Sequence, residues 1–105
     1  MIHSRENGFT KYEGKALQGI GALYLQMDMN DEALITLESA LLLHEEMGDR
    51  RGEAMDRLFI GMIHRTSSPE KAEECLRRAR TISQEIGDPI IYNKANHLLS
   101  RGFKL

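Results

Sequence analysis

Apolar residues recur along this chain at the spacing of an α-helix, and one arrangement of them occurs twice. When residues 32–49 are laid over residues 71–88, at an offset of 39, the apolar positions of the two segments coincide. Within each segment these positions step by three or four residues, which is one stripe of an amphipathic helix. The matched pairs are Ala33/Ala72, Leu37/Leu76, Ala40/Ala79, Leu43/Ile82 and Met47/Ile86. The pattern predicts a repeated helix whose small alanines allow a neighbouring helix to approach closely.

The same Gly-Asp pair closes both copies, at residues 48–49 and 87–88. Glycine suits the left-handed position that ends a helix, and aspartate is a favoured N-cap for a following helix. Ser68 before Pro69 predicts an N-cap and a first-turn proline for the second copy, and Asn30 is expected to be the N-cap of the first. The Gly-Asp pair is therefore predicted to be the joint where one helix stops and the next begins.

Each repeated helix is preceded by another helical segment, at residues 14–26 and 52–64, and a further segment covers residues 90–104. Gly21 and Gly61 lie in the middle of the first two, where glycine costs about 1 kcal/mol relative to alanine. We therefore expect a second helix to pack there too closely for a Cβ atom. Short connections force antiparallel neighbours. The sequence predicts an all-α solenoid of antiparallel helical hairpins, about two and a half repeats long, in the helix order A-B-A-B-A.

A chain of 105 residues is too short for two independent cores, so we predict a single domain over residues 1–105. Within it, repeat one is expected at about 10–48, repeat two at about 49–87 and a C-terminal helix at about 88–104.

The pattern resembles the tetratricopeptide repeat (TPR), whose signature is Trp-x2-Leu-Gly-x2-Tyr, then Ala-x3-Phe and a late Pro. The matching residues are Leu17, Ile20, Gly21, Tyr24, Ala33, Leu37 and Ala40 in repeat one, and Ile60, Gly61, Ala72, Leu76 and Ala79 in repeat two, where Arg57 and His64 depart from the pattern. The period of 39–41 residues and the missing late proline are similar to an extended variant found in spindle-orientation adaptors and in sensor arrays of bacterial signalling regulators. HEAT-like and other helical-hairpin repeats remain alternatives.

This resemblance implies a scaffold whose A helices line a concave groove for a peptide or a partner helix. Carried over to this sequence, the candidate groove residues are Lys15, Gln18, Ala22, Gln26, Met55, Leu58, Phe59 and Met62. Methionine suits an adaptable apolar groove. The alternative is that Met55, Phe59 and Met62 pack in the core between helices. The clamp with which some family members hold a C-terminal carboxylate is not expected, because Ala22 and Met62 stand where the clamp needs an asparagine.

The overall charge gives no indication of a nucleic-acid partner. The formal net charge is −2 and the pI is about 6.1, whereas a protein that binds phosphates usually carries a basic surplus. The one basic run, residues 77–80, follows Glu73 and Glu74 at a spacing of four residues. Ion pairs at that spacing stabilise an exposed helix face by about 0.2–0.5 kcal/mol each. We therefore interpret this run as a solvated helix face and expect no nucleic acid to bind.

Chemistry-bearing residues are few and scattered. The four histidines stand at no metal-ligand spacing, so we expect no catalytic residue, no cofactor and no metal, and no enzyme activity. His44 aligns with Ser83 and is expected to be a partly buried structural residue. Cys75 is a lone cysteine and is expected to pack rather than react. The single cysteine and the absence of a secretory signal favour the cytoplasm. No apolar run is long enough to span a membrane, so we expect no membrane partner.

The two ends of the predicted solenoid differ. In the last helix Asn93, Lys94, His97, Arg101 and Lys104 are expected to face water while Ala95, Leu98 and Leu99 face inward. The first helix has no such polar cap, and solenoid repeats bury their apolar faces only against neighbours. We therefore predict a homo-dimer or a larger assembly, through edge-to-edge docking or a swapped helix pair, or membership of a longer protein. The function predicted is a protein- or peptide-binding adaptor; alternatives are a sensor fragment that binds a peptide or small effector, and a purely structural oligomer.

Overall fold

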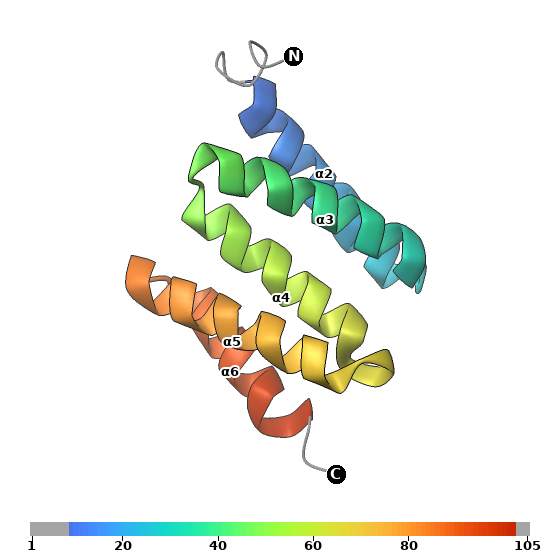
Figure 1. The fold of residues 1–105 in the computed structure, drawn as a ribbon, viewed down its shortest axis with the longest axis vertical. Coiled ribbons are helices and arrows are strands. Elements are labelled where there is room, and N and C mark those ends of the chain that lie inside the picture. Colours follow the sequence, from blue (N-terminus) through green and yellow to red (C-terminus); the bar gives the residue numbers. More distant parts are fainter. Residues whose placement is uncertain (1–8, 103–105) are drawn as a thin grey trace.

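The computed structural model describes residues 9–102, with their side chains from residue 12 to residue 100. Its elements are the helices α2 (Phe9–Gln26), α3 (Asn30–Met47), α4 (Arg50–Ser67), α5 (Pro69–Ile86) and α6 (Pro89–Gly102). The described part of the chain contains no strand, and each helix packs against the next one (Figure 1). The predicted all-α fold of antiparallel helical hairpins is confirmed. Within these residues, no helix is both long and apolar enough to cross a membrane.

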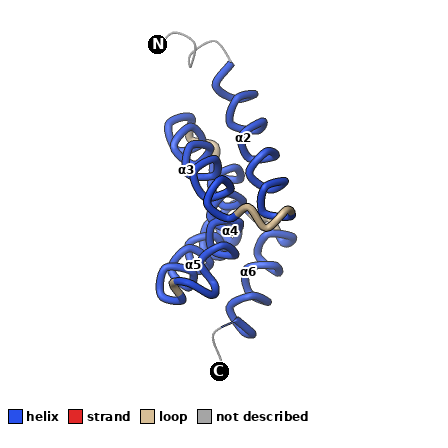
Figure 2. The backbone as a smooth tube through the Cα atoms, turned by 90° about the vertical axis from the view of Figure 1, so that its right-hand side faces the viewer, coloured by secondary structure: helices blue, strands red, loops and turns tan. Residues whose placement is uncertain are grey.

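The helices form two layers. In Figure 2, α3 and α5 lie on one side and α2 and α6 on the other, with α4 in the middle. Helix α4 also contacts both α2 and α6. We refer to α2, α4 and α6 as the A layer and to α3 and α5 as the B layer. The surface of the A layer that faces away from the B layer is the A-helix face.

The Gly-Asp joints have the predicted geometry. Their two glycines lie in the left-handed region, with φ of 69° and 75°. The carboxylate of Asp49 accepts a hydrogen bond from the backbone N–H of Gly52 at 2.9 Å, and that of Asp88 accepts one from Ile91 at 3.1 Å. Both joints therefore end one helix and cap the next in the same way, so that position n of α4 corresponds to position n + 39 of α6.

The starts of the B helices were predicted with mixed success. Ser68 is the N-cap of α5 and Pro69 its first residue, as predicted, although the Ser68 side chain makes no capping hydrogen bond. The prediction for α3 is wrong by one residue, since Met29 is the N-cap and Asn30 already lies in the helix. The reason is that Asp28, at φ 60°, takes the left-handed conformation and completes the turn before Asn30. The A helices α2 and α4 begin earlier than predicted, at residues 9 and 50.

The repeated apolar stripe forms the core. Its fully buried members are Ala33, Leu37, Ala40, Ala72, Leu76 and Ala79, each 0% exposed. The mid-helix glycines pack directly onto this stripe. A Cβ atom at Gly21 would lie 2.5 Å from Cγ of Leu37, and one at Gly61 would lie 2.8 Å from Cγ of Leu76. Since such distances are too short for a real Cβ contact, the predicted close approach of a second helix is confirmed.

Ion pairs cover part of the outer surface. Arg77 pairs with Glu73 at 2.7 Å, as the spacing predicted. Arg78, which was expected to pair with Glu74, instead has its Nη2 atom 3.9 Å from Glu53 of α4. This contact links α5 to α4. Within α4, Glu53 also forms an ion pair with Arg57.

Candidate functional site: a buried histidine–aspartate pair beneath the A-helix face

A buried polar cluster joins the first three described helices. Nδ1 of His44 in α3 lies 2.5 Å from Oδ2 of Asp56 in α4, and the two side chains are 2% and 0% exposed. The other carboxylate oxygen, Oδ1, accepts a hydrogen bond from Nε2 of Gln18 in α2 at 2.8 Å. The same Gln18 nitrogen donates to the carbonyl oxygen of Gly52 at 3.3 Å. Both carboxylate oxygens of Asp56 are thereby satisfied inside the protein, as a buried charge requires.

The imidazole ring of His44 is held between two glycines. A Cβ atom at Gly14 would lie 2.9 Å from Nε2 of His44, and one at Gly52 would lie 2.5 Å from Cδ2. The ring thus occupies the space that side chains on α2 and α4 would otherwise need. Its orientation is fixed by packing on both sides and by the bond to Asp56.

Two opposing influences act on the carboxyl group of Asp56. Burial raises its pKa, because a charged form loses its water, while the hydrogen bonds from Gln18 and His44 favour the charged form. Since a carboxylate oxygen can only accept a hydrogen bond, we assign a proton to Nδ1 of His44, as donor to Oδ2 of Asp56. The second ring nitrogen of His44, Nε2, then faces Asp49, whose Oδ2 lies 4.0 Å away.

Above this cluster, the A-helix face is hollowed between α2 and α4. The cavity has a volume of about 190 Å³ and is lined by Lys15, Gln18, His44, Asp49, Arg51, Gly52 and Met55. Arg51 donates from Nε to Asp88 at 2.7 Å, so its charge is already paired. The ammonium group of Lys15 makes no ion pair with any side chain that the structure describes. Lys15 therefore gives the cavity an available cation at its rim.

Some of the predicted groove residues meet at this cavity. Lys15 and Gln18 of α2 line it together with Met55 of α4. Met62 lies seven residues, or about two turns, beyond Met55 on the same face of α4 and is 37% exposed. Lys15, Gln18, Met55 and Met62 thus lie along the A-helix face. Met55 is half-buried and also packs against the core clusters of Leu76 and Ile82, so it belongs to the core as well as to the cavity wall.

The remaining predicted groove residues are placed differently. Ala22 is half-buried and Gln26 is exposed, and neither lines the cavity. Leu58 is 2% exposed and packs in the core with Leu76, so its assignment to the groove is wrong. The reason is that Leu58 lies on the side of α4 that faces α5. Phe59 is half-buried and packs against the core cluster of Ile60, on the side of α4 nearer α3.

Asp56 is the residue of this site that sequence reasoning missed. It precedes Ile60 by four residues and Ile63 by seven, so it lies on the same apolar stripe of α4 as two core residues. A charged residue on such a stripe indicates a buried partner, and His44, on the stripe of the preceding helix, is the matching signal. His44 was expected to be partly buried and structural, and it is almost completely buried.

The corresponding position in the second repeat is apolar. The equivalents of Gly14, Gln18, His44, Gly52 and Asp56 are Ala54, Leu58, Ser83, Ile91 and Ala95, at offsets of 39 or 40 residues. Ala54 and Ile91 pack in one apolar cluster, and Leu58 and Ala95 in another. The hydroxyl of Ser83 donates to the carbonyl of Arg80 in its own helix, at 2.9 Å. The same joint is therefore built once with a polar cluster and once without.

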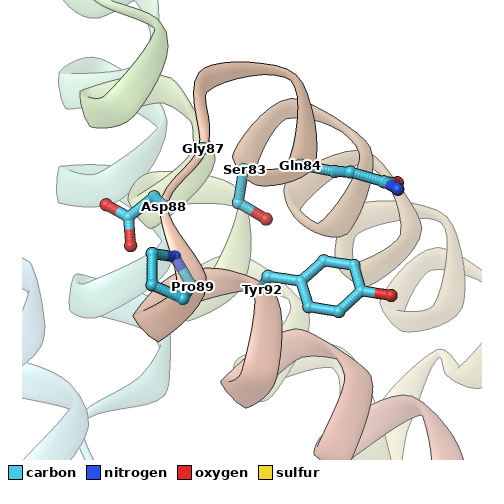
Figure 3. A pocket seen from close by; sticks show the side chains of 6 residues that line it. All are labelled: Ser83, Gln84, Gly87, Asp88, Pro89 and Tyr92. Carbon is cyan, nitrogen blue, oxygen red and sulfur yellow. The ribbon is translucent and has the colours of Figure 1, made fainter.

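A larger hollow lies at the joint of α5 and α6, with a volume of about 460 Å³ (Figure 3). Figure 3 shows the side chains of Asp88 and Tyr92 pointing apart around it. The carboxylate of Asp88 is bonded by the N–H of Ile91 and by Arg51, which hold the pKa of Asp88 below its ordinary value. Two polar groups of this hollow, the carboxylate of Asp88 and the hydroxyl of Ser83, are thus already engaged within the chain.

The cavity above His44 offers a cation, Lys15, and a fixed amide, Gln18, for binding a partner. No serine, threonine or cysteine is among the residues that line it. Cys75 packs against the core cluster of Leu37 and Ile60, and burial raises the pKa of its thiol. Among the described residues, no group of three His, Cys, Asp or Glu side chains could hold a metal ion.

Comparison with known proteins adds no relative. A scan against protein-family models, a search of curated proteins and a search of solved structures all find no match for this chain. Its function is therefore inferred from the geometry of the described residues.

Proposed function

We propose that this chain is a cytoplasmic scaffold that binds a protein or peptide on its A-helix face and also associates with itself. One observation carries the binding proposal: two separate A helices contribute predicted groove residues, Lys15, Gln18 and Met55, to one cavity. The resemblance to the TPR family agrees with this use of the A helices, and membership of that family is part of the proposal.

The chemistry of the cavity indicates what a partner would present. Lys15 offers an ammonium group that no described side chain pairs, which favours an acidic side chain on the partner. Met55 and Met62 offer flexible apolar surface next to it, which favours an apolar side chain two turns away. Gln18 is fixed by its bond to Asp56, so this wall of the cavity is pre-organised by the buried cluster below.

Selection of peptides from a random display library against the immobilised chain tests this proposal. We expect selected peptides to combine acidic and apolar residues and to lose at least tenfold in affinity for the Lys15→Glu and Met62→Glu variants, about 1.4 kcal/mol. Met47→Glu is the matched control, because Met47 and Met62 are 38% and 37% exposed, and Met47 ends helix α3 in the B layer. Equal affinity of the selected peptides for all four proteins contradicts the proposal.

A sensor fragment is the second candidate, and the position of the buried cluster favours it. Gln18, His44 and Asp56 come from three successive helices, so their bonds fix how the first hairpin sits on α4. A ligand that altered these bonds would change the angle between the hairpins. We compare the sedimentation coefficient of the monomeric chain with and without a selected peptide. A change larger than the mass of the bound peptide alone would cause favours this candidate over a rigid adaptor.

A further inference from the structure

One face of α2 is apolar and uncovered in the described chain. Its members are Tyr12, Ala16, Gly19, Ile20 and Leu23, together with Met27 just beyond the end of the helix, and we call them the α2 face. Apart from the adjacent Gly19 and Ile20, they follow one another at steps of three or four residues. Tyr12, Leu23 and Met27 are 73%, 57% and 60% exposed. Of the ten exposed large hydrophobic residues in the described chain, seven lie between residues 12 and 47. Apolar exposure is thus concentrated at the N-terminal end of the solenoid, and a patch of this kind marks an interaction site.

Comparison with α4 shows what the α2 face is shaped to receive. On α4, the side chains of Asp56, Ile60 and Ile63 pack against α3, which runs antiparallel to it. At an offset of 40 residues, their counterparts on α2 are Ala16, Ile20 and Leu23. The α2 face therefore corresponds to the surface on which an antiparallel helix packs one repeat later.

The opposite end of the solenoid is not complementary to this face. On α6, Ile91 and Ala95 are buried, whereas three polar residues, Asn93, Lys94 and His97, are exposed together with one large apolar residue, Ile90. Head-to-tail stacking of copies would press the apolar α2 face onto this largely polar surface. Two α2 faces match each other instead, which is the isologous arrangement of a two-fold dimer.

We propose that the α2 face is a dimer interface, in which α2 of a second copy lies antiparallel across a two-fold axis between Gly19 and Ile20. This rests on the self-association in the proposed function and names its surface. In that register, residues whose numbers sum to 39 lie opposite each other. Leu23 then faces Ala16 of the second copy and Ile20 faces Gly19, so large side chains meet small ones near the axis, while Tyr12 and Met27 face each other at the ends. No charged residue lies within the face, so the two copies bring no like charges together.

The size of the α2 face sets the expected strength. Six residues a side are fewer than the roughly 20–30 of a standard interface, so the dimer is expected to be reversible and dependent on concentration. A neighbouring hollow of about 220 Å³ between α2 and α3 is lined by Leu17, Leu42 and Leu43 and equally by Glu13, Ser39 and Glu46, so it adds little apolar surface.

Sedimentation over about a hundredfold range of concentration tests the interface by mass action. We expect wild type and Met62→Glu to pass from monomer to dimer together, and Leu23→Glu to remain monomeric. Because Leu23 is 57% exposed, its substitution leaves the core intact, which the helical circular dichroism of the variant verifies. A monomeric wild type, or a Leu23→Glu variant that dimerises like wild type, overturns the interface. Peptide binding by Leu23→Glu reports on the A-helix face separately, so either proposal can fail alone.

Cysteine cross-linking tests the antiparallel register in a Cys75→Ser background. In the proposed dimer, Ala16 lies opposite Leu23 of the second copy. The two Ala16 residues of the dimer are about 10 Å apart along the helix axis, and so are the two Leu23 residues. A disulfide needs Cα atoms within about 7 Å. We expect a mixture of Ala16→Cys and Leu23→Cys proteins to cross-link and each protein alone not to do so. Self-linking of either variant, or no mixed product from a sample that sediments as a dimer, overturns this register.

Discussion

Nδ1 of His44 in α3 lies 2.5 Å from Oδ2 of Asp56 in α4, and both side chains are almost completely shielded from water. The carboxylate accepts a second hydrogen bond from α2, through Gln18. This pair thus connects three helices at the base of the cavity on the A-helix face, where the equivalent joint of the next repeat is apolar.

Removal of one member of the pair should be costly. We expect Asp56→Ala to lower the free energy of unfolding by about 3–5 kcal/mol, because it leaves the donors of His44 and Gln18 buried without an acceptor. Urea denaturation followed by circular dichroism measures the change. Glu38→Ala, an exposed acidic position on α3, is the control and should change stability by less than about 0.5 kcal/mol. A loss for Asp56→Ala no larger than that of the control would contradict the structural role of the pair.

Replacing the residues of the polar first joint by those of the apolar second joint should recover most of the stability that Asp56→Ala loses. The combined variant carries Gly14→Ala, Gln18→Leu, His44→Ser, Gly52→Ile and Asp56→Ala, which are the residues of the apolar joint. A buried hydrogen-bonded polar pair can often be replaced as a whole by apolar packing at little cost, whereas the removal of one partner alone is costly. We expect the combined variant to unfold at a urea concentration closer to that of wild type than to that of Asp56→Ala. A combined variant less stable than Asp56→Ala would show that the two joints pack differently.

Asp56 and Asp88 should respond to pH with opposite signs. Burial raises the folded-state pKa of Asp56 above 3.8, so the stability that it contributes is present below that pH and is lost as the pH rises through the folded pKa. The N–H of Ile91 lowers the pKa of Asp88, so its contribution is present above pH 3.8 and is lost as the pH falls through the folded pKa. Unfolding free energies of wild type, Asp56→Asn and Asp88→Asn across the acidic range measure both slopes. Two slopes of the same sign would refute this assignment.

The mid-helix glycines give a matched pair of substitutions. Gly61→Ala should destabilise by about 1–3 kcal/mol through overpacking, since its Cβ would lie 2.8 Å from Cγ of Leu76 and 3.3 Å from the carbonyl oxygen of Ala72. At Gly19, where a Cβ meets nothing within 4 Å, alanine should stabilise by up to about 1 kcal/mol through its helix propensity. Denaturation at a concentration below dimerisation compares the two. Equal effects at both positions would mean that close packing does not explain Gly61.

The architecture was predictable because it depends on local signals that occur twice. The Gly-Asp joints, the alanines of the stripe and the mid-helix glycines each have a direct structural consequence, and the structure contains all of them. The prediction that Asn30 is the N-cap of α3 was wrong, because Asp28 takes the left-handed conformation in the turn before α3. Aspartate adopts this conformation less often than glycine does, so the turn has no clear signal in the sequence.

The site was less predictable because it depends on how helices face one another. Helical spacing places Met55 and Leu58 on neighbouring faces of α4, but only the packing of α5 decides that Leu58 is buried. Likewise, only the approach of α2 and α3 to α4 decides that His44 and Gln18 both bond to Asp56. The stripe of α4 signalled that Asp56 is buried, but not which side chains it would meet.

The most direct test of binding on the A-helix face is an NMR titration of the isotope-labelled chain with a peptide selected by display. We predict that the largest shifts occur at the backbone amides of Lys15, Met55 and Met62 and at the side-chain amide of Gln18. The monomeric Leu23→Glu variant should show the same shifts, because its A-helix face is unchanged. Shifts confined to the B layer, at α3 and α5, would contradict binding on the A-helix face.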